Sequence, residues 1–202
     1  MEQRTDEWFK ARLAKVTASK INDVLATIKS GEAATRRNYR TQLVAERLTG
    51  MQASEVYVNA AMQHGIDTEE EARNAYIFSH ADVVEVGFVN HPSIAMSGAS
   101  PDGLVDNDGL IEIKCPQTAT HTETLVSQQV PNKYINQMMW QMACTDRKWC
   151  DFVSYSPFFP ENLKMFVKRV ERDDKLIKHL EDEVKKFLTE VEDTVKFLKE
   201  SR

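Results

Sequence analysis

The segment SPDGLVDNDGLIEIKCP, residues 100–116, constrains the fold more than any other part of this sequence. Apolar residues alternate with other residues on both sides of NDG at 107–109, which supplies residues that tolerate positive φ at a hairpin tip. The pattern therefore predicts a β-hairpin. Because side chains alternate faces along a strand, we expect Glu112 and Lys114 to share one face, with the flanking isoleucines on the other.

This hairpin carries charged groups that its fold does not require. Asp102 lies at the start of the first strand, where an antiparallel partner brings it close to Glu112. Two carboxylates that converge beside a backbone carbonyl form an all-oxygen site, which suits Mg²⁺ or Mn²⁺ better than zinc. Lys114 on the same face would hold a water for attack on a phosphodiester. The alternative interpretation is a surface hairpin with solvated acids and a cross-strand salt bridge.

Other periodic segments set the fold class. Helices are expected at residues 5–15, 16–28, 36–48, 59–78 and 133–145 and from Asp173 to the end. Strands are expected at 83–90, around Ile94 and Met96, at 149–155 and at 164–171. The order predicts an α+β (mixed α/β) fold: a central mixed sheet flanked by helices, with a long amphipathic C-terminal helix, in a single domain spanning 1–202.

Composition narrows the function classes. The net charge of −5 and the pI of about 5.6 argue against a protein that coats nucleic acid by charge alone, but not against an enzyme with a local basic groove. No apolar run approaches a membrane span, so no membrane role is expected. The three cysteines have no CxxC spacing, which favours a reducing cytoplasm over a disulfide framework or a structural zinc site.

Ordered motifs along most of the chain resemble the PD-(D/E)xK nuclease superfamily. They are most similar to the phage-type alkaline exonucleases, the group of lambda exonuclease and the YqaJ-like viral recombinases. The motifs are EWFKARLAKVTAS at 7–19, HGIDTEEEA at 64–72, SPDGL and EIKCP in the hairpin, and the Y-x-x-Q of Tyr134 to Gln137. The resemblance implies a PD-(D/E)xK restriction-endonuclease-like core.

The resemblance also implies a role for individual residues. The metal ligands would be Asp102, Glu112 and the backbone carbonyl of Ile113, and Lys114 would orient the attacking water. Glu69 would supply a third carboxylate to the catalytic group, whereas the neighbouring acids Glu70 and Glu71 are expected to be solvated surface.

A pocket for a terminal 5′-phosphate is implied as well. Its members would be Arg12, Ser19, Ser100 and Gln137. A guanidinium fork matches a phosphate dianion, and hydroxyl groups donate further hydrogen bonds. The alternative for Arg12 is a surface arginine, and Thr17 nearby could be only a helix cap. In the polar segment 29–37, Lys29, Arg36 and Arg37 would either meet DNA phosphates or lie in a solvated loop.

The expected activity is that of a Mg²⁺-dependent 5′-to-3′ exonuclease, with Mn²⁺ as a substitute. It would digest one strand of linear double-stranded DNA to mononucleotides, leaving a 3′ overhang for a single-strand annealing protein. The resemblance further implies a homotrimeric ring and a phage or prophage protein in the cytoplasm of a bacterial host. The alternatives are an endonuclease of restriction or junction-resolving type, and a DNA-end-binding module with a decayed site.

Overall fold

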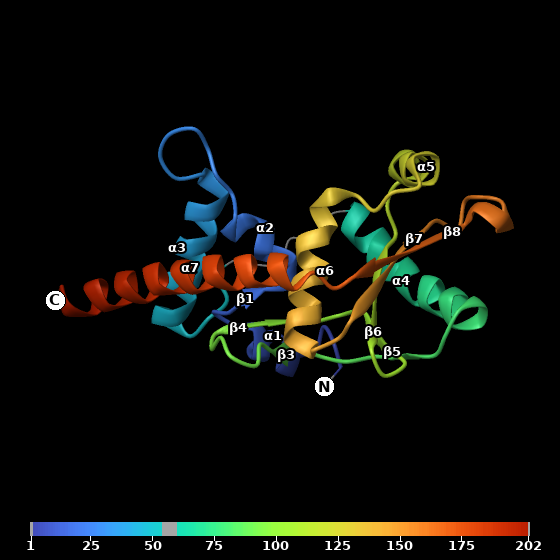
Figure 1. The fold of residues 1–202 in the computed structure, drawn as a ribbon. Coiled ribbons are helices and arrows are strands. Elements are labelled where there is room, and N and C mark those ends of the chain that lie inside the picture. The colour runs from blue at the N-terminus through green and yellow to red at the C-terminus, as the bar shows by residue number, and fades with distance from the viewer. Residues whose placement is uncertain (1, 54–59, 202) are drawn as a thin grey trace.

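The computed structural model describes residues 2–53 and 60–201. Its helices are α1 Asp6–Arg12, α2 Ile21–Val24, α3 Ala34–Thr49, α4 Ala60–Ser79, α5 Thr118–Ser127, α6 Asn132–Thr145 and α7 Asp174–Glu200. Its strands are β1 Val16–Thr17, β2 Val83–Val84, β3 Val89–Asn90, β4 Ser97–Ala99, β5 Gly103–Val105, β6 Gly109–Lys114, β7 Trp149–Tyr155 and β8 Met165–Glu171. The predicted mixed α+β class with a long C-terminal helix is confirmed (Figure 1).

Two sheets carry these strands. The larger has the order β2-β5-β6-β7-β8, in which β6 and β7 are parallel and the other pairs antiparallel. The smaller has the order β1-β4-β3. The predicted hairpin is β5–β6, and its register sets Gly103 opposite Ile111, so that Asp102 lies beside Glu112. At its tip the positive φ of 47° belongs to Asp106, not to the expected residues 107–109.

Both faces of β6 are covered, by different helices. On one face Ile111 and Ile113 pack with Ala72 and Tyr76 of α4. The other face packs against α6 and α7, through a cluster that includes the buried Trp140. Met138, Met139 and Met142 of α6 belong to the same cluster. Glu112 therefore points into the α6 side, where it is 1% exposed.

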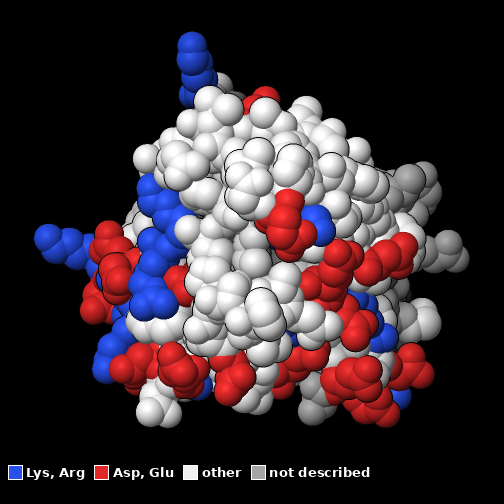
Figure 2. Space-filling view, turned by 90° about the vertical axis from the view of Figure 1, so that its right-hand side faces the viewer, with Lys and Arg blue, Asp and Glu red and all other residues white. Residues whose placement is uncertain are grey.

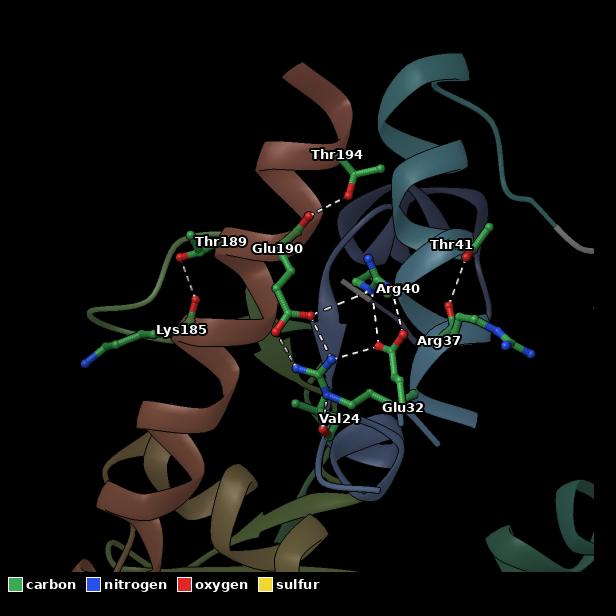
Figure 3. A network of polar contacts seen from close by, with 10 residues as sticks. Val24, Glu32, Arg37, Arg40, Thr41, Lys185, Thr189, Glu190 and Thr194 are labelled. Carbon is green, nitrogen blue, oxygen red and sulfur yellow. Dashed lines mark hydrogen bonds and ion pairs between the residues drawn. The ribbon is translucent and has the colours of Figure 1, made fainter. Parts of the chain in front are cut away.

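The long helix α7 begins at its cap Asp173, whose side chain accepts hydrogen bonds from the amides of Lys175 and Leu176. Figure 3 shows how its middle is tied to α3 by charged side chains. Arg36 donates two hydrogen bonds to Glu190, at 2.7 and 2.8 Å, and one to Glu32 at 2.8 Å. Arg36 is thus bound within the fold, contrary to both expectations, a DNA contact or a solvated loop.

Several predicted elements differ from the structure. The expected helix 16–28 is divided into β1, a 3₁₀ turn and the four-residue α2, because Val16 and Thr17 pair in parallel with β4. The expected strand 83–90 is two short strands, one in each sheet. The strand expected around Ile94 and Met96 begins at Ser97, after a turn in which Met96 has a φ of 59°.

Helix α5 was not predicted, because its threonine-rich sequence has low helix propensity. The expected start of the fourth helix, Asn59, lies outside the described residues. None of the helices in the described part of the chain has the length and apolarity that a membrane crossing would need.

Candidate active site

The end of β6 brings the charged residues of the hairpin together. The Oδ2 atom of Asp102 accepts a hydrogen bond from the backbone amide of Ile113 at 2.6 Å. Lys114 forms an ion pair with Oε1 of Glu112. The cross-strand register and the alternation of side chains produce this cluster, as the sequence pattern predicts.

Two glutamines of α6 hold the buried Glu112. Gln137 donates to its Oε1 atom and Gln141 to its Oε2 atom, each at 2.6 Å. Both carboxylate oxygens are thus fixed by side chains one helical turn apart. Gln137, expected among the phosphate-binding residues, is bound to this carboxylate, and its phosphate-binding role stays a prediction. Gln141 was missed by the sequence analysis, although a glutamine four residues after Gln137 in an apolar run was a usable signal.

Electrostatics make this cluster unusual for a protein interior. Burial, and next the charge of Glu112, raise the pKa of Asp102 well above its usual range. Burial lowers the pKa of Lys114, but the Glu112 and Asp102 carboxylates raise it more, so its pKa is above normal and its ammonium stays protonated. Two carboxylates share one lysine, which leaves excess negative charge in a buried place.

Glu69 on α4 lies at the border of this cluster. Its carboxylate is held by Arg4 at 2.6 Å and by Arg73 at 2.8 Å. Its charge also contributes to the raised pKa of Asp102, after burial and the charge of Glu112. Glu71, expected to be solvated surface, accepts a hydrogen bond from the hydroxyl of Tyr155 at 2.6 Å.

The oxygen donors fit a hard divalent cation. Across residues 2–53 and 60–201, no three His, Cys, Asp or Glu side chains form a group that could enclose a metal. The set of Asp102, Glu112 and the carbonyl of Ile113 instead matches Mg²⁺ or Mn²⁺, which keep several waters and need few carboxylates. A cation there would offset the repulsion that raises the pKa of Asp102.

A second charged group lies next to the hairpin. The guanidinium of Arg12 lies over the Trp8 ring, 4.0 Å from its centroid, and donates to Oγ of Ser100 at 3.1 Å. The indole Nε1 of Trp8 donates to the same oxygen at 2.9 Å. Ser100 precedes Asp102 by two residues, so this group adjoins the carboxylate cluster.

Arg12 and Ser19 both line a cavity of about 490 Å³. Three more basic residues, Arg4, Lys15 and Lys20, line it as well, and so does one acid, Glu46. In the described part of the chain no carboxylate pairs with Arg12, and burial lowers its pKa. The hydroxyl of Thr17, considered as a helix cap, lies 3.4 Å from that of Ser19. A partly buried guanidinium that faces a cavity and forms no ion pair in the described residues is suited to an anion.

Helix α3 fixes the backbone that follows Arg12. The carboxylate of Glu46 accepts a hydrogen bond from the amide of Ala14 at 2.8 Å, where the chain turns with a φ of 58°. The hydroxyl of Tyr39 accepts from the amide of Thr17 at 3.2 Å. The chain that follows Arg12 is therefore held at Ala14 and at Thr17.

The model of the YqaJ-like viral recombinase domain matches residues 7–148. The chain belongs to the YqaJ-like viral recombinase family. This is a family of phage-type exonucleases, as the sequence resemblance indicated.

Solved structures of similar proteins agree with this family assignment. LHK-Exo in complex with dAMP is 51% identical, with a TM-score of 0.91 over 98% of this chain and 97% of that one. The alkaline exonuclease LHK-Exo from Laribacter hongkongensis is 50% identical, with a TM-score of 0.89 over the same shares. A phage related exonuclease from Haemophilus somnus 129PT shares the fold at 17% identity, with a TM-score of 0.71 over 93% and 96% of the two chains. No curated protein sequence matches the YqaJ-family chain.

Proposed function

We propose that this YqaJ-family chain is a Mg²⁺-dependent 5′-to-3′ exonuclease. It digests one strand of linear double-stranded DNA to mononucleotides and leaves a 3′ overhang. The observation that carries the proposal is the contact of Arg12 with Ser100, two residues from Asp102. A site for a terminal phosphate thus adjoins a site for hydrolysis, which is the arrangement that removal of one nucleotide at a time requires.

The residues at the end of β6 divide the chemistry between them. Asp102, Glu112 and the carbonyl of Ile113 would hold Mg²⁺ or Mn²⁺, which acidifies a water and offsets charge on the phosphodiester. Lys114, protonated because of its acidic neighbours, orients the attacking water and balances the charge that develops on the phosphate. Glu69 is the third carboxylate of the group.

The direction of digestion depends on the Arg12 pocket. A terminal 5′-phosphate carries more charge than an internal phosphodiester, so Arg12, Ser19 and Ser100 would select it. LHK-Exo has been crystallised with dAMP, a nucleoside monophosphate of the class that such digestion releases. The rival endonuclease hypothesis gives these residues no task, because an endonuclease needs no terminal-phosphate pocket.

The assembly and setting are proposed from the family. A homotrimeric ring around DNA would let a chain with a net charge of −5 stay bound without a strongly basic surface. A single-strand annealing protein would receive the 3′ overhang. The chain would act in the cytoplasm of a bacterial host, encoded by a phage or prophage.

The test uses otherwise identical linear duplexes with a 5′-phosphate or a 5′-hydroxyl end. Loss of a charge-assisted bidentate contact costs about 1.5–3 kcal/mol, or roughly ten- to a hundredfold in rate. We expect Arg12→Ala to lose that much on phosphorylated ends and much less on hydroxyl ends. Lys196→Ala, at an exposed position on α7 that no DNA contact has been assigned to, is the control. Cleavage of a circular duplex at the rate of the linear one would contradict the exonuclease proposal.

A further inference from the structure

An exposed phenylalanine occupies the turn between β7 and β8. Phe158 is 73% exposed, and its ring stacks on that of His64 in α4, with centroids 5.7 Å apart and planes at 18°. A single exposed apolar residue is common on protein surfaces and has no meaning by itself. Phe158 differs in two respects: contacts with α5 hold its turn in place, and that turn lies at the end of the sheet where the catalytic residues are.

The turn is anchored by its neighbours. Phe159 packs edge-on against the buried His121, with ring centroids 4.8 Å apart. The two ring nitrogens of His121 contact Oγ of Ser154 and the carbonyl oxygen of Leu163, each at 2.8 Å. These contacts tie both ends of the turn to α5. Phe158 is thus presented on a rigid support with a ring behind it.

The turn leaves the sheet at the same end of the strands as the catalytic residues. Strands β6 and β7 are parallel, and Ser154 is the register partner of Lys114. Phe158 follows four residues later. From α4, His64 lies five residues before Glu69, which is about 7.5 Å along a helix axis.

The order of strands places Phe158 opposite the phosphate pocket. Ser100, which contacts Arg12, precedes β5, and Phe158 follows β7. Strand β6, with Glu112 and Lys114 at its end, lies between them. A strand held at its 5′ end by Arg12 would therefore pass the catalytic residues before it reaches Phe158.

Charge on this side of the molecule agrees with an apolar contact. Figure 2 looks onto the side where the β7–β8 turn and α5 lie. Its upper part has few charged side chains, whereas acidic side chains gather along the lower part. Binding here would have to come from stacking on a ring more than from attraction to the DNA backbone.

We propose that Phe158, backed by His64, is a stacking site for a DNA base. The base belongs to the cleaved strand, on the 3′ side of the bond to be hydrolysed. This inference rests on the proposed exonuclease function. Stacking on an aromatic ring tolerates every base, because each has a π-face, and it suits an enzyme that must move along any sequence. It would hold the next nucleotide in place while the terminal one is removed.

The test measures binding without turnover. The probe is a 5′-phosphorylated duplex in chelator, with one abasic site moved through the first several nucleotides of the strand to be cleaved. Loss of one stacked base is expected to weaken binding by about five- to a hundredfold. Wild type should show this loss at one position. Phe158→Ala should bind intact DNA as weakly as wild type binds the duplex with that abasic site. The same abasic site should not weaken its binding any further. Phe158→Tyr should bind every duplex as wild type does.

The control is Phe78→Ala, since Phe78 is 94% exposed near the other end of α4. It should bind as wild type does at every abasic position. The inference is overturned if Phe158→Ala binds intact DNA as tightly as wild type, or if Phe158→Leu binds as well as Phe158→Tyr. The two proposals can fail separately. If an abasic site weakens binding only when Phe158 is present, but the protein does not hydrolyse DNA with Mg²⁺, the stacking site is supported and the exonuclease proposal is refuted. Normal hydrolysis without such dependence would refute the stacking site alone.

Discussion

The ion pairs beside α7 and the charged group at the end of β6 are built from the same kinds of side chain in different proportions. Beside α7, two arginines face two glutamates: Arg36, Arg40, Glu32 and Glu190 (Figure 3). At the end of β6, the two carboxylates of Asp102 and Glu112 face the single ammonium of Lys114. Charge is balanced in the first cluster and left in excess in the second.

The pKa directions follow from this difference. The pKa of Glu32 is lowered mainly by the hydrogen bond from Arg40. The pKa of Arg36 is raised mainly by its hydrogen bond to Glu190. Each charged form is therefore favoured by folding. For Asp102 the shift is opposite, because burial and Glu112 oppose its charge. The first cluster stabilises the fold, and the second keeps a destabilising charge that a bound cation would offset.

The largest effect is expected from Asp102→Asn. Removal of a residue that only orients a metal ligand typically costs about 10- to 100-fold, so loss of a ligand should reduce hydrolysis by more than about a hundredfold. When folding raises the pKa of a carboxyl group, that group destabilises the fold increasingly as pH rises. The loss begins near its pKa in the unfolded chain, about 4, and is complete above its pKa in the folded protein. We therefore expect Asp102→Asn to raise the free energy of unfolding at pH 7.5 by about 1 kcal/mol.

Hydrolysis of an end-labelled duplex and urea unfolding at pH 5.5 and 7.5 check both parts. The gain in stability should be smaller at pH 5.5, where more of the wild-type Asp102 is protonated. Asp106→Asn, at an exposed position in the tip of the same hairpin, is the control and should change neither measurement by much. A destabilised Asp102→Asn would mean that the carboxylate serves the fold.

A smaller effect is expected from Gln141→Met, which keeps the side-chain length but removes the hydrogen bond to Glu112. The freed carboxylate oxygen is buried, so Glu112 should turn from its position. Affinity for Mn²⁺ should fall by about 10- to 100-fold, as measured by electron paramagnetic resonance titration without DNA. Gln117→Met, at an exposed position before α5, is the control. Unchanged Mn²⁺ affinity would leave Gln141 with a packing role only.

The smallest effect on cleavage is expected where the charges balance. Arg36→Ala removes hydrogen bonds to Glu32 and Glu190 and should lower the free energy of unfolding by about 1–3 kcal/mol. Hydrolysis at 25 °C should be unchanged. The exposed pair of Lys178 and Asp182 provides the comparison, since Lys178→Ala should cost less than about 0.5 kcal/mol in the same urea titration. If both variants lost the same free energy of unfolding, the Arg36 cluster would stabilise the fold no more than an exposed ion pair does.

The sequence predicts those parts whose signals are local. The hairpin that carries Asp102 and Glu112, the helix α6 and the closing helix α7 all follow from alternation or helical spacing within one segment. Strand β1 could not be predicted in this way, because Val16 and Thr17 are extended only through their pairing with Ser97 and Gly98.

Contacts between side chains that are far apart in the sequence could not be predicted from local patterns either. The alternatives for Arg36 were both wrong, since its partner Glu190 lies 154 residues away. Gln141 was given no role, because the carboxylate that it binds belongs to another element. The predicted roles of Arg12, Ser19 and Glu69 stay predictions. The structure places Arg12 and Ser19 along one cavity and Glu69 between Arg4 and Arg73.

The parallel pairing of β6 and β7 affects when a newly made chain can become active. Parallel neighbours need a crossover, and here the crossover includes α6 with both glutamines that hold Glu112. The acids and the lysine are therefore synthesised before the groups that orient them, and α7, which packs against α6, is synthesised later still. Non-local contacts also slow folding, because the chain between them must first close into a loop. A nascent chain would thus be inert until α6 has left the ribosome and packed against β6.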